Sequence, residues 1–226
     1  MAASFPFLVP AARLRPPQYH YASTGLPAFD ALAGGLPRGA ITEVFGPPGS
    51  GRTSLLWTTL ATATARGDFC ALVDATDAFD PAAAAQAGVP LDRLLWVRCG
   101  GDPERALKAA DRIVNDGGFN LLVLDLADLP LRIVRRIPLV CWFRLRRAIE
   151  GTPAILLVIA SQPVTGASAS LVVEMKGARA VWSGAPGARL LEGGVFELSL
   201  RPDKPGLRKS VHQEVAFFAA RVSWAR

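Results

Sequence analysis

The stretch Ala40-Ile41-Thr42-Glu43-Val44-Phe45, followed by Gly46-Pro47-Pro48-Gly49-Ser50-Gly51-Arg52-Thr53-Ser54, decides the fold of this chain. An apolar run leads into a glycine-rich loop, and the loop leads into a helical pattern over residues 55–65. This order of strand, loop and helix is the context of a phosphate-binding loop. Backbone N–H groups can curl around phosphate oxygens only where no Cβ intervenes, and the helix N-terminus adds partial positive charge. A plain glycine turn is the alternative interpretation.

One residue departs from the phosphate-binding template. The pattern G-x-x-x-x-G-K-[ST] has lysine where this chain has Arg52. Lysine reaches terminal phosphates as a compact point charge, whereas arginine carries a planar fork of different reach. The sequence therefore predicts nucleotide binding and puts hydrolysis in question.

The rest of the chain predicts an α/β fold. Apolar runs at residues 69–74, 94–98, 120–125 and 154–161 read as buried strands, separated by helical patterns that include 81–87 and 102–116. Such strands form a parallel sheet with helices on both faces. Residues 178–182, 195–201 and 214–219 alternate like antiparallel strands and predict a C-terminal antiparallel extension.

Three candidate site residues fall where predicted strands end. Gly46, Asp74 and Asp125 each follow or close such a strand, and parallel sheets bind ligands at the carboxyl ends of their strands. Asp125 is placed like the magnesium-side carboxylate of a phosphate-binding loop, and Thr53 would supply a hydroxyl to the ion. A simple cap at the strand end is the other interpretation of Asp125.

Composition predicts one globular domain with an extended arm. The chain has 226 residues, of which 50% are hydrophobic and 19% charged, enough to bury a substantial core. We expect an arm over residues 1–21 and a core over residues 22–226. No apolar run is long enough to span a membrane and no secretion signal is expected, so the prediction is a cytoplasmic protein. Three cysteines without metal spacing predict buried thiols and no metal site.

Charge is distributed unevenly along the chain. Residues 1–130 hold 10 Lys/Arg and 13 Asp/Glu, and residues 131–226 hold 15 and 6, so the two parts carry −3 and +9. Six arginines fall within residues 132–147. In residues 131–150, Pro138 would stand at a first helical turn, and Cys141, Leu145, Ala148 and Ile149 would form a buried face. A polyanion-facing surface, a solvated basic face and a surface for an acidic protein are all compatible with this charge.

Several short motifs in fixed order resemble the RecA family. They are Ser23-Thr24-Gly25, Leu32-Ala33-Gly34-Gly35-Leu36-Pro37-Arg38-Gly39, Glu43 with Gly46-Pro47, and Val73-Asp74-Ala75 with Asp80-Pro81. The resemblance covers residues 22–162 and implies a RecA-like core, with Gln162 as the residue that senses nucleotide. Length, lost sites and the arginine-rich region are most similar to the ImuA-type RecA relatives of translesion mutagenesis.

The resemblance also shows what this chain lacks. The family's catalytic glutamate falls on Thr76 and its adenine-stacking tyrosine on Ala83, besides the lysine replaced by Arg52. The first DNA-binding loop is deleted after Asp125, and the second is cut to residues 165–170. We therefore expect no catalytic residues and no efficient ATP hydrolysis, with weak binding of ATP and magnesium as an open question and no other cofactor.

The expected function is a RecA-like accessory role in DNA repair, the SOS response to DNA damage and translesion synthesis. Expected partners are DNA, a component of an error-prone polymerase complex, and a second copy of the chain. An active ATP-dependent recombinase and a nucleotide-binding regulator are the alternatives. The candidate nucleotide-binding residues are Gly46, Pro47, Pro48, Gly49, Ser50, Gly51, Arg52, Thr53, Ser54, Asp125 and Gln162. The candidate DNA-binding residues are Arg132, Arg135, Arg136, Arg146, Arg147, Lys204, Arg208 and Lys209. Phe5, Phe7 and Leu8 of the arm are expected to dock on a protein, with a frayed terminus as the alternative.

Overall fold

The computed structural model describes residues 19–185, 190–201 and 213–214. Its centre is an eight-stranded sheet in the order β10-β9-β8-β3-β7-β6-β4-β5. The neighbouring pairs from β8 to β5 are parallel, and β9 and β10 add antiparallel pairs. The strands are β3 (Ala40–Phe45), β4 (Cys70–Asp74), β5 (Leu94–Arg98), β6 (Leu121–Asp125), β7 (Ile155–Ala160), β8 (Leu171–Ser183), β9 (Leu190–Arg201) and β10 (Gln213–Glu214). The predicted α/β class with a C-terminal antiparallel extension is confirmed.

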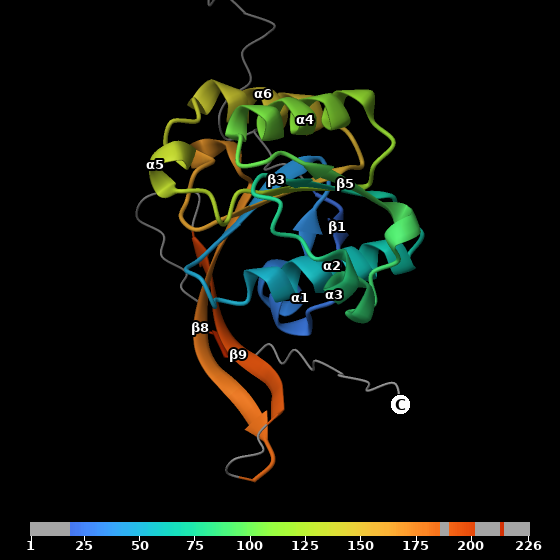
Figure 1. Ribbon diagram of the computed structural model, residues 1–226. Helices are drawn as coiled ribbons and strands as arrows, with labels where there is room; N and C mark the ends of the chain where they lie inside the picture. Colours follow the sequence, from blue (N-terminus) through green and yellow to red (C-terminus); the bar gives the residue numbers. More distant parts are fainter. Residues whose placement is uncertain (1–18, 186–189, 202–212, 215–226) are drawn as a thin grey trace, which may run out of the picture.

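Helices cover both faces of this sheet (Figure 1). One face carries α1 (Pro27–Ala33), α2 (Arg52–Ala65) and α3 (Pro81–Gln86), and the other carries α4 (Pro103–Asp116) and α6 (Leu139–Ile149). The short helix α5 (Leu131–Val134) and the 3₁₀ helices η2 (Leu91–Arg93) and η3 (Gly166–Ser168) complete the set in the described residues. Asp80 and Asp102 cap α3 and α4 by accepting backbone N–H groups, and a proline follows each cap.

The alternation of side chains along the strands explains the two layers. Val44, Leu72, Val123 and Leu157 point into the core under α1 and α2. Their strand neighbours, such as Ile41, Val73, Leu124 and Val158, join the core under α4 and α6. A strand buried on both faces must be apolar throughout, which is the pattern of these runs.

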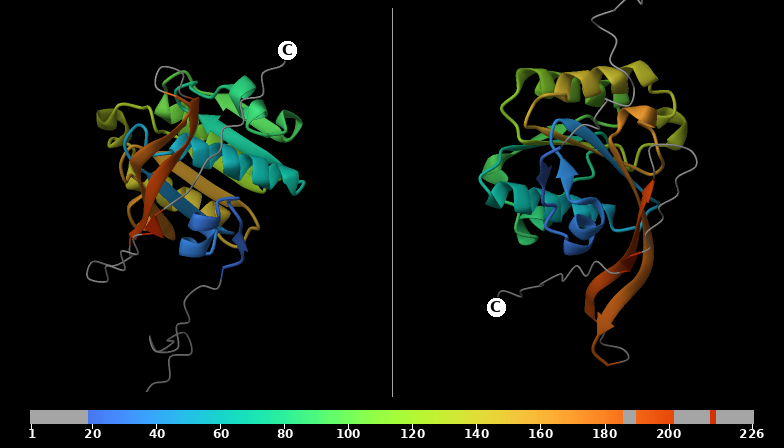
Figure 2. Two further views of the ribbon diagram at one scale, coloured as in Figure 1. Left: turned by 90° about the horizontal axis from the view of Figure 1, so that it is seen from below. Right: turned by 180° about the vertical axis from the view of Figure 1, so that it is seen from behind.

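The structure corrects one strand boundary expected from the sequence. Strand β8 starts at Leu171 rather than near residue 178, and its first residues pair in parallel with β3, Thr42 opposite Leu171. Pairing beside the central strand buries Val173 and Met175 completely, and this partner is not visible in the local sequence. Strands β8 and β9 then continue as a long antiparallel hairpin that projects beyond the sheet (Figure 2).

The arginine-rich segment forms two helices, and the second begins directly after Pro138, where the sequence predicted a first helical turn. Pro138 has extended backbone and is the N-cap of α6, while α5 ends at Val134. The buried residues of α6 are Trp142, Leu145 and Ile149. Cys141 and Ala148, which we expected on the buried face, are only half-buried, because the helix rotates so that the large indole of Trp142 fills the space below it.

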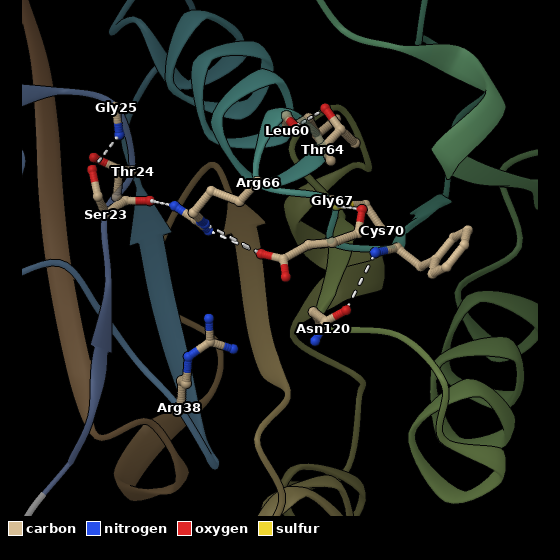
Figure 3. Close-up of polar contacts among 12 residues, drawn as sticks. Ser23, Thr24, Gly25, Arg38, Leu60, Thr64, Arg66, Gly67, Cys70 and Asn120 are labelled. Atoms are coloured by element: carbon tan, nitrogen blue, oxygen red, sulfur yellow. Dashed lines mark hydrogen bonds and ion pairs between the residues drawn. The ribbon is translucent and has the colours of Figure 1, made fainter.

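The amino-terminal edge is anchored to the end of α2. Residues 21–22 (β1) pair with residues 36–37 (β2), so a short strand includes Tyr21, the last residue of the expected arm. Arg66 Nη1 donates to the carbonyl oxygen of Ser23 at 3.0 Å, and its Nη2 bonds to Asp68 at 3.1 Å (Figure 3). The Asp30 carboxylate accepts the hydroxyls of Ser23 and Thr24. The Ser23-Thr24-Gly25 motif therefore fixes the amino-terminal edge to α1 and to the end of α2.

Candidate nucleotide-binding loop and basic surfaces

The glycine loop follows β3 and opens α2 as predicted. Gly51 is the N-cap of α2 with φ +88°, and no side chain caps the helix. Pro47, Pro48 and Gly49 are exposed, whereas Ser50 is buried and its hydroxyl has no partner among the described residues. Uncapped N–H groups at a helix N-terminus favour an anion. The backbone of the loop thus fits a phosphate group.

Strand β8 and the hairpin pack tightly against this loop. A Cβ at Gly46 would collide with the carbonyl oxygen of Met175, and a Cβ at Gly177 would lie 2.6 Å from the carbonyl oxygen of Gly49. A Cβ at Gly51 would lie 2.7 Å from the ring of Phe196. Two of the loop glycines are therefore required by contacts within the protein as well as by any phosphate.

The side chain of Arg52 turns into the protein. It is 7% exposed, and its Nη1 donates to the carbonyl oxygen of Ala160 at 2.7 Å. The same carbonyl accepts the N–H of Gly46 at 3.3 Å. Burial lowers the pKa of Arg52, while the charges of Asp125 and Asp128 act in the opposite direction. The guanidinium thus ties the start of α2 to the end of β7.

Two aspartates lie side by side at the carboxyl ends of their strands. Asp74 of β4 and Asp125 of β6 are register partners. Burial raises the pKa of Asp125, the nearby carboxylates of Asp74 and Asp128 add to the rise, and the resulting pKa is about 6. Arg52 and a hydrogen bond from the N–H of Ala127 oppose the rise. The predicted meeting of Gly46, Asp74 and Asp125 at one edge is confirmed.

Asp74 is fully engaged in holding the loop after β4. It accepts backbone N–H groups from Thr76, Ala78 and Phe79, and the indole Nε1 of Trp96 at 3.2 Å. Thr76, at the position where the RecA resemblance places a catalytic glutamate, is half-buried and carries a hydroxyl only. Ala83 lies on α3 and presents one methyl group. Thr76 therefore cannot act as the catalytic glutamate of the resemblance, and Ala83 cannot act as its adenine-stacking tyrosine.

Glu43 is a buried residue whose role was not assigned from the sequence. It is 1% exposed on β3, and its carboxylate accepts the N–H groups of Val164 and Thr165 and the hydroxyl of Thr165. Burial raises its pKa, and these hydrogen bonds oppose the rise. The carboxylate holds the segment after β7 in place. A charge inside the apolar run 40–45 was the signal that could have indicated this role.

The candidate arginines divide between the two ends of the sheet. Arg135 Nη2 donates to Gln162 Oε1 at 3.3 Å, which places α5 and Gln162 together at the carboxyl end. Arg146 Nη1 donates to the carbonyl oxygen of Ala167. The Arg146 side chain also lines a cavity of about 680 Å³ at the amino-terminal end of the strands, together with Arg38, Gly39 and Thr152. Arg132, Arg136 and Arg147 are exposed, and no ion pair involves them within the described ranges.

The remaining candidates lie outside the described residues. These are Lys204, Arg208 and Lys209, and Phe5, Phe7 and Leu8 of the arm. The cysteines are free thiols, with Cys70 and Cys99 buried and Cys141 half-buried, and burial raises the pKa of Cys70 to about 12. Across the described residues no group of three or more His, Cys, Asp or Glu side chains is placed to hold a metal ion.

Residues 17–130 match the family model described as the RecA N-terminal domain. The chain belongs to the RecA family. The match covers the glycine loop, the Asp74 and Asp125 strands and the helices between them, which are the elements that form the candidate site.

Individual RecA proteins match just under half of the chain. Protein RecA of Rhodospirillum rubrum is 46% identical over 105 residues, which is 46% of this chain and 28% of that protein. Protein RecA of Blastochloris viridis is 44% identical over 105 residues, covering 46% of this chain and 30% of the relative. Protein RecA of Cutibacterium acnes is 43% identical over 104 residues. The matched part thus spans less than a third of the length of these relatives.

No helix in the described part of this RecA-family chain has the length and apolar character needed to cross a membrane.

Proposed function

We propose that this chain is a RecA-family accessory protein of DNA repair and translesion synthesis that binds DNA and a polymerase-associated partner without efficient ATP hydrolysis. The observation that carries the proposal is the inward turn of Arg52, whose guanidinium donates to the Ala160 carbonyl at 2.7 Å. Because the Arg52 guanidinium is hydrogen-bonded to the backbone of β7, it does not face the mouth of the loop, where terminal phosphates would lie.

The chemistry of the loop supports phosphate binding without turnover. When bound, ATP with magnesium would supply the phosphoryl group, with Thr53 and Asp125 beside the ion. Thr76 cannot deprotonate or orient an attacking water, and a missing general base typically costs about 10²–10⁴ in rate. Ala83 offers no ring for adenine to stack on. Both losses favour weak nucleotide binding and a role that does not consume ATP.

The arginines supply the proposed DNA contacts. Arg132, Arg135 and Arg136 gather on and after α5, beside Gln162 at the same edge as the glycine loop. Arg146 and Arg147 lie near the far end of α6 and would extend the contact along the backbone of a nucleic acid. Between Asp125 and Leu131 only five residues connect the sheet to α5, too few for a loop that inserts between bases. The contacts should therefore be to phosphates and independent of sequence.

One experiment tests hydrolysis directly. We expect purified protein to show no ATP turnover above background in a coupled phosphate-release assay, and calorimetry to show no ATP binding at micromolar concentration. The double variant Arg52→Lys with Thr76→Glu should raise turnover if the loss lies in these side chains. ATP turnover by the wild type that is abolished in Asp125→Asn would contradict the proposal and favour an active recombinase.

A second experiment tests DNA binding on the same preparation. Replacing Arg132, Arg135 and Arg136 with alanine should weaken binding equally on unrelated single-stranded oligonucleotides. Each lost contact should also flatten the log–log salt dependence by about 0.7. The matched control replaces Arg105, Lys108 and Arg112, which are exposed on α4, and should leave binding nearly unchanged. Wild-type protein that shifts no DNA at low salt would exclude this role.

A further inference from the structure

Helix α6 is held on three sides by the protein. Trp142, Leu145 and Ile149 point into the core. Arg144 Nε pairs with Asp111 Oδ1 on α4 at 2.9 Å. On the other flank, Arg146 Nη1 donates to the Ala167 carbonyl of η3 at 3.1 Å. The fourth side faces away from the sheet, on the upper surface of the molecule (Figure 1).

That fourth side exposes large apolar side chains. Leu139, Val140 and Phe143 are 57%, 69% and 48% exposed. Arg147 is one turn beyond Phe143 and exposed, so Val140, Phe143 and Arg147 share a face at spacings of three and four residues. We call Leu139, Val140, Phe143 and Arg147 the outer face of α6. Contiguous exposed apolar groups with a charged border are typical of a protein interaction site.

The charged side chains of residues 131–149 are all positive, and the exposed Glu150 follows them at the C-cap of α6. Residues 131–149 contain six arginines and no aspartate or glutamate. Within the described residues, two of the six use their charge on a side-chain carboxylate or amide, Arg144 with Asp111 and Arg135 with Gln162. Arg136 and Arg147 stand before and after the apolar group with no ion pair in the described residues. A ligand for this surface must therefore match apolar groups at its centre and positive charge at both ends.

We infer that the outer face of α6 docks an amphipathic helix of a protein partner whose apolar stripe is bordered by aspartate or glutamate. Val140 to Arg147 spans about 10 Å along the helix, which corresponds to about two turns of a partner helix lying alongside. Such a helix offers anchors at i, i+3 and i+4 to Val140 and Phe143. Its carboxylates would meet Arg136 and Arg147.

A nucleic acid matches this face less well. Phosphates would pair with the arginines but would leave the exposed alkyl groups of Leu139 and Val140 without a complement. Duplex bases are stacked inside the helix, and the bases of a single strand stack on aromatic rings such as that of Phe143 rather than on these two aliphatic side chains. Arg132 and Arg135 at the carboxyl edge lie outside the outer face and remain proposed DNA contacts, whereas Arg136 and Arg147 are the positions at which the two proposals compete. The inference names the chemistry of the protein partner in the proposed function and rests on it only for the idea that a partner exists.

The test uses the full chain and a designed peptide. The probe is a fluorescein-labelled 16-residue helical peptide with leucine and phenylalanine at i, i+3, i+4 and i+7 and glutamate on its flanks. A peptide of the same composition in scrambled order and a peptide with lysine in place of glutamate are the ligand controls. Fluorescence anisotropy at low salt should show binding of the acidic amphipathic peptide at least tenfold tighter than of either control.

Variants locate the binding. Val140→Glu with Phe143→Glu should weaken binding at least tenfold, and Arg136→Ala with Arg147→Ala should weaken it severalfold and reduce its salt dependence. Leu91→Glu places the same charge on a 41% exposed leucine elsewhere and should bind like the wild type. Circular dichroism melts confirm folding of each variant. Binding equal to that of the scrambled peptide, or binding kept by Val140→Glu with Phe143→Glu, would overturn the inference.

The same variants separate this inference from the DNA proposal. If Val140→Glu with Phe143→Glu leaves oligonucleotide binding intact while it abolishes peptide binding, the two surfaces are distinct as inferred. If that variant weakens oligonucleotide binding and the peptide never binds, the outer face belongs to the nucleic-acid surface and the inference is wrong.

Discussion

The glycine loop and the outer face of α6 treat their charged and apolar groups in opposite ways. At the loop, Arg52 donates to a backbone carbonyl and Asp74 accepts four hydrogen bonds, while β8 and β9 press on the glycines. On α6, three large apolar side chains and Arg147 face outward. The loop carries the family motif and has become part of the scaffold. The helix carries no motif and leaves its groups available to a ligand.

The largest effect that we expect from this contrast is a loss of stability when a methyl group is added at Gly46. Gly46→Ala should destabilise the protein by about 3 kcal/mol, because its Cβ meets the backbone carbonyl of Met175, which cannot move without breaking the pairing of β3 with β8. Gly49→Ala is the matched control in the same loop. Its Cβ would have open space, and only its φ of +76° is unfavourable, so the cost should be about 1 kcal/mol. Urea unfolding measures both, and equal losses would show that β8 does not press on the loop.

The pH dependence of Asp125 gives the next effect. Its pKa is raised in the folded protein from 3.8 to about 6, so the native state binds the proton more tightly and loses stability as pH rises from about 4 to about 6. A shift of this size corresponds to about 2–3 kcal/mol. Asp125→Asn should therefore gain stability relative to the wild type across this window and stay parallel to it above pH 7.

The control for Asp125→Asn is the same substitution at an exposed carboxylate outside the site. Asp92→Asn changes an exposed aspartate of η2 and should leave the slope of stability against pH as in the wild type. Urea unfolding of the three proteins at pH 4, 5, 6 and 7 is the measurement. A constant difference between Asp125→Asn and the wild type at every pH would mean that burial at the loop edge does not raise the pKa of Asp125.

The smallest effect compares two arginines. Arg52→Ala should cost about 2 kcal/mol, because it removes a charged hydrogen bond to the buried carbonyl of Ala160. Arg147→Ala, on the outer face of α6, should change stability by less than about 0.5 kcal/mol. Thermal and urea unfolding under one buffer measure the pair. Similar losses would show that Arg147 is a structural residue and would weaken the docking inference.

Predictions from the sequence succeeded where local pattern and burial coincide. The parallel strands are apolar along their whole length, and Asp80 and Asp102 each precede a proline at a helix start, so strands, caps and the order of the motifs were predictable from local residues. The meeting of Gly46, Asp74 and Asp125 followed from the rule that parallel strands place their carboxyl ends at one edge.

Predictions failed where a distant partner decides the outcome. The start of β8 depends on β3, which is about 130 residues earlier, and the rotation of α6 depends on the space that Trp142 fills below it. Glu43 looked like one more strand residue, and its partners Val164 and Thr165 come 121 and 122 positions later. Sequence spacing carries no information on such contacts.

The sequence by itself determined the family, the α/β class and the identity of the missing side chains, because the glycine loop, Thr76 and Ala83 are read directly from residue order. Only the tertiary structure decided where the arginines go. A guanidinium can reach a carbonyl, a carboxylate or solvent from the same helix position, and the choice depends on which elements pack beside it. Here Arg52 donates to a carbonyl of β7, Arg144 pairs with Asp111 of α4, and Arg146 donates to a carbonyl of η3. Arg147, one turn beyond Phe143, faces outward.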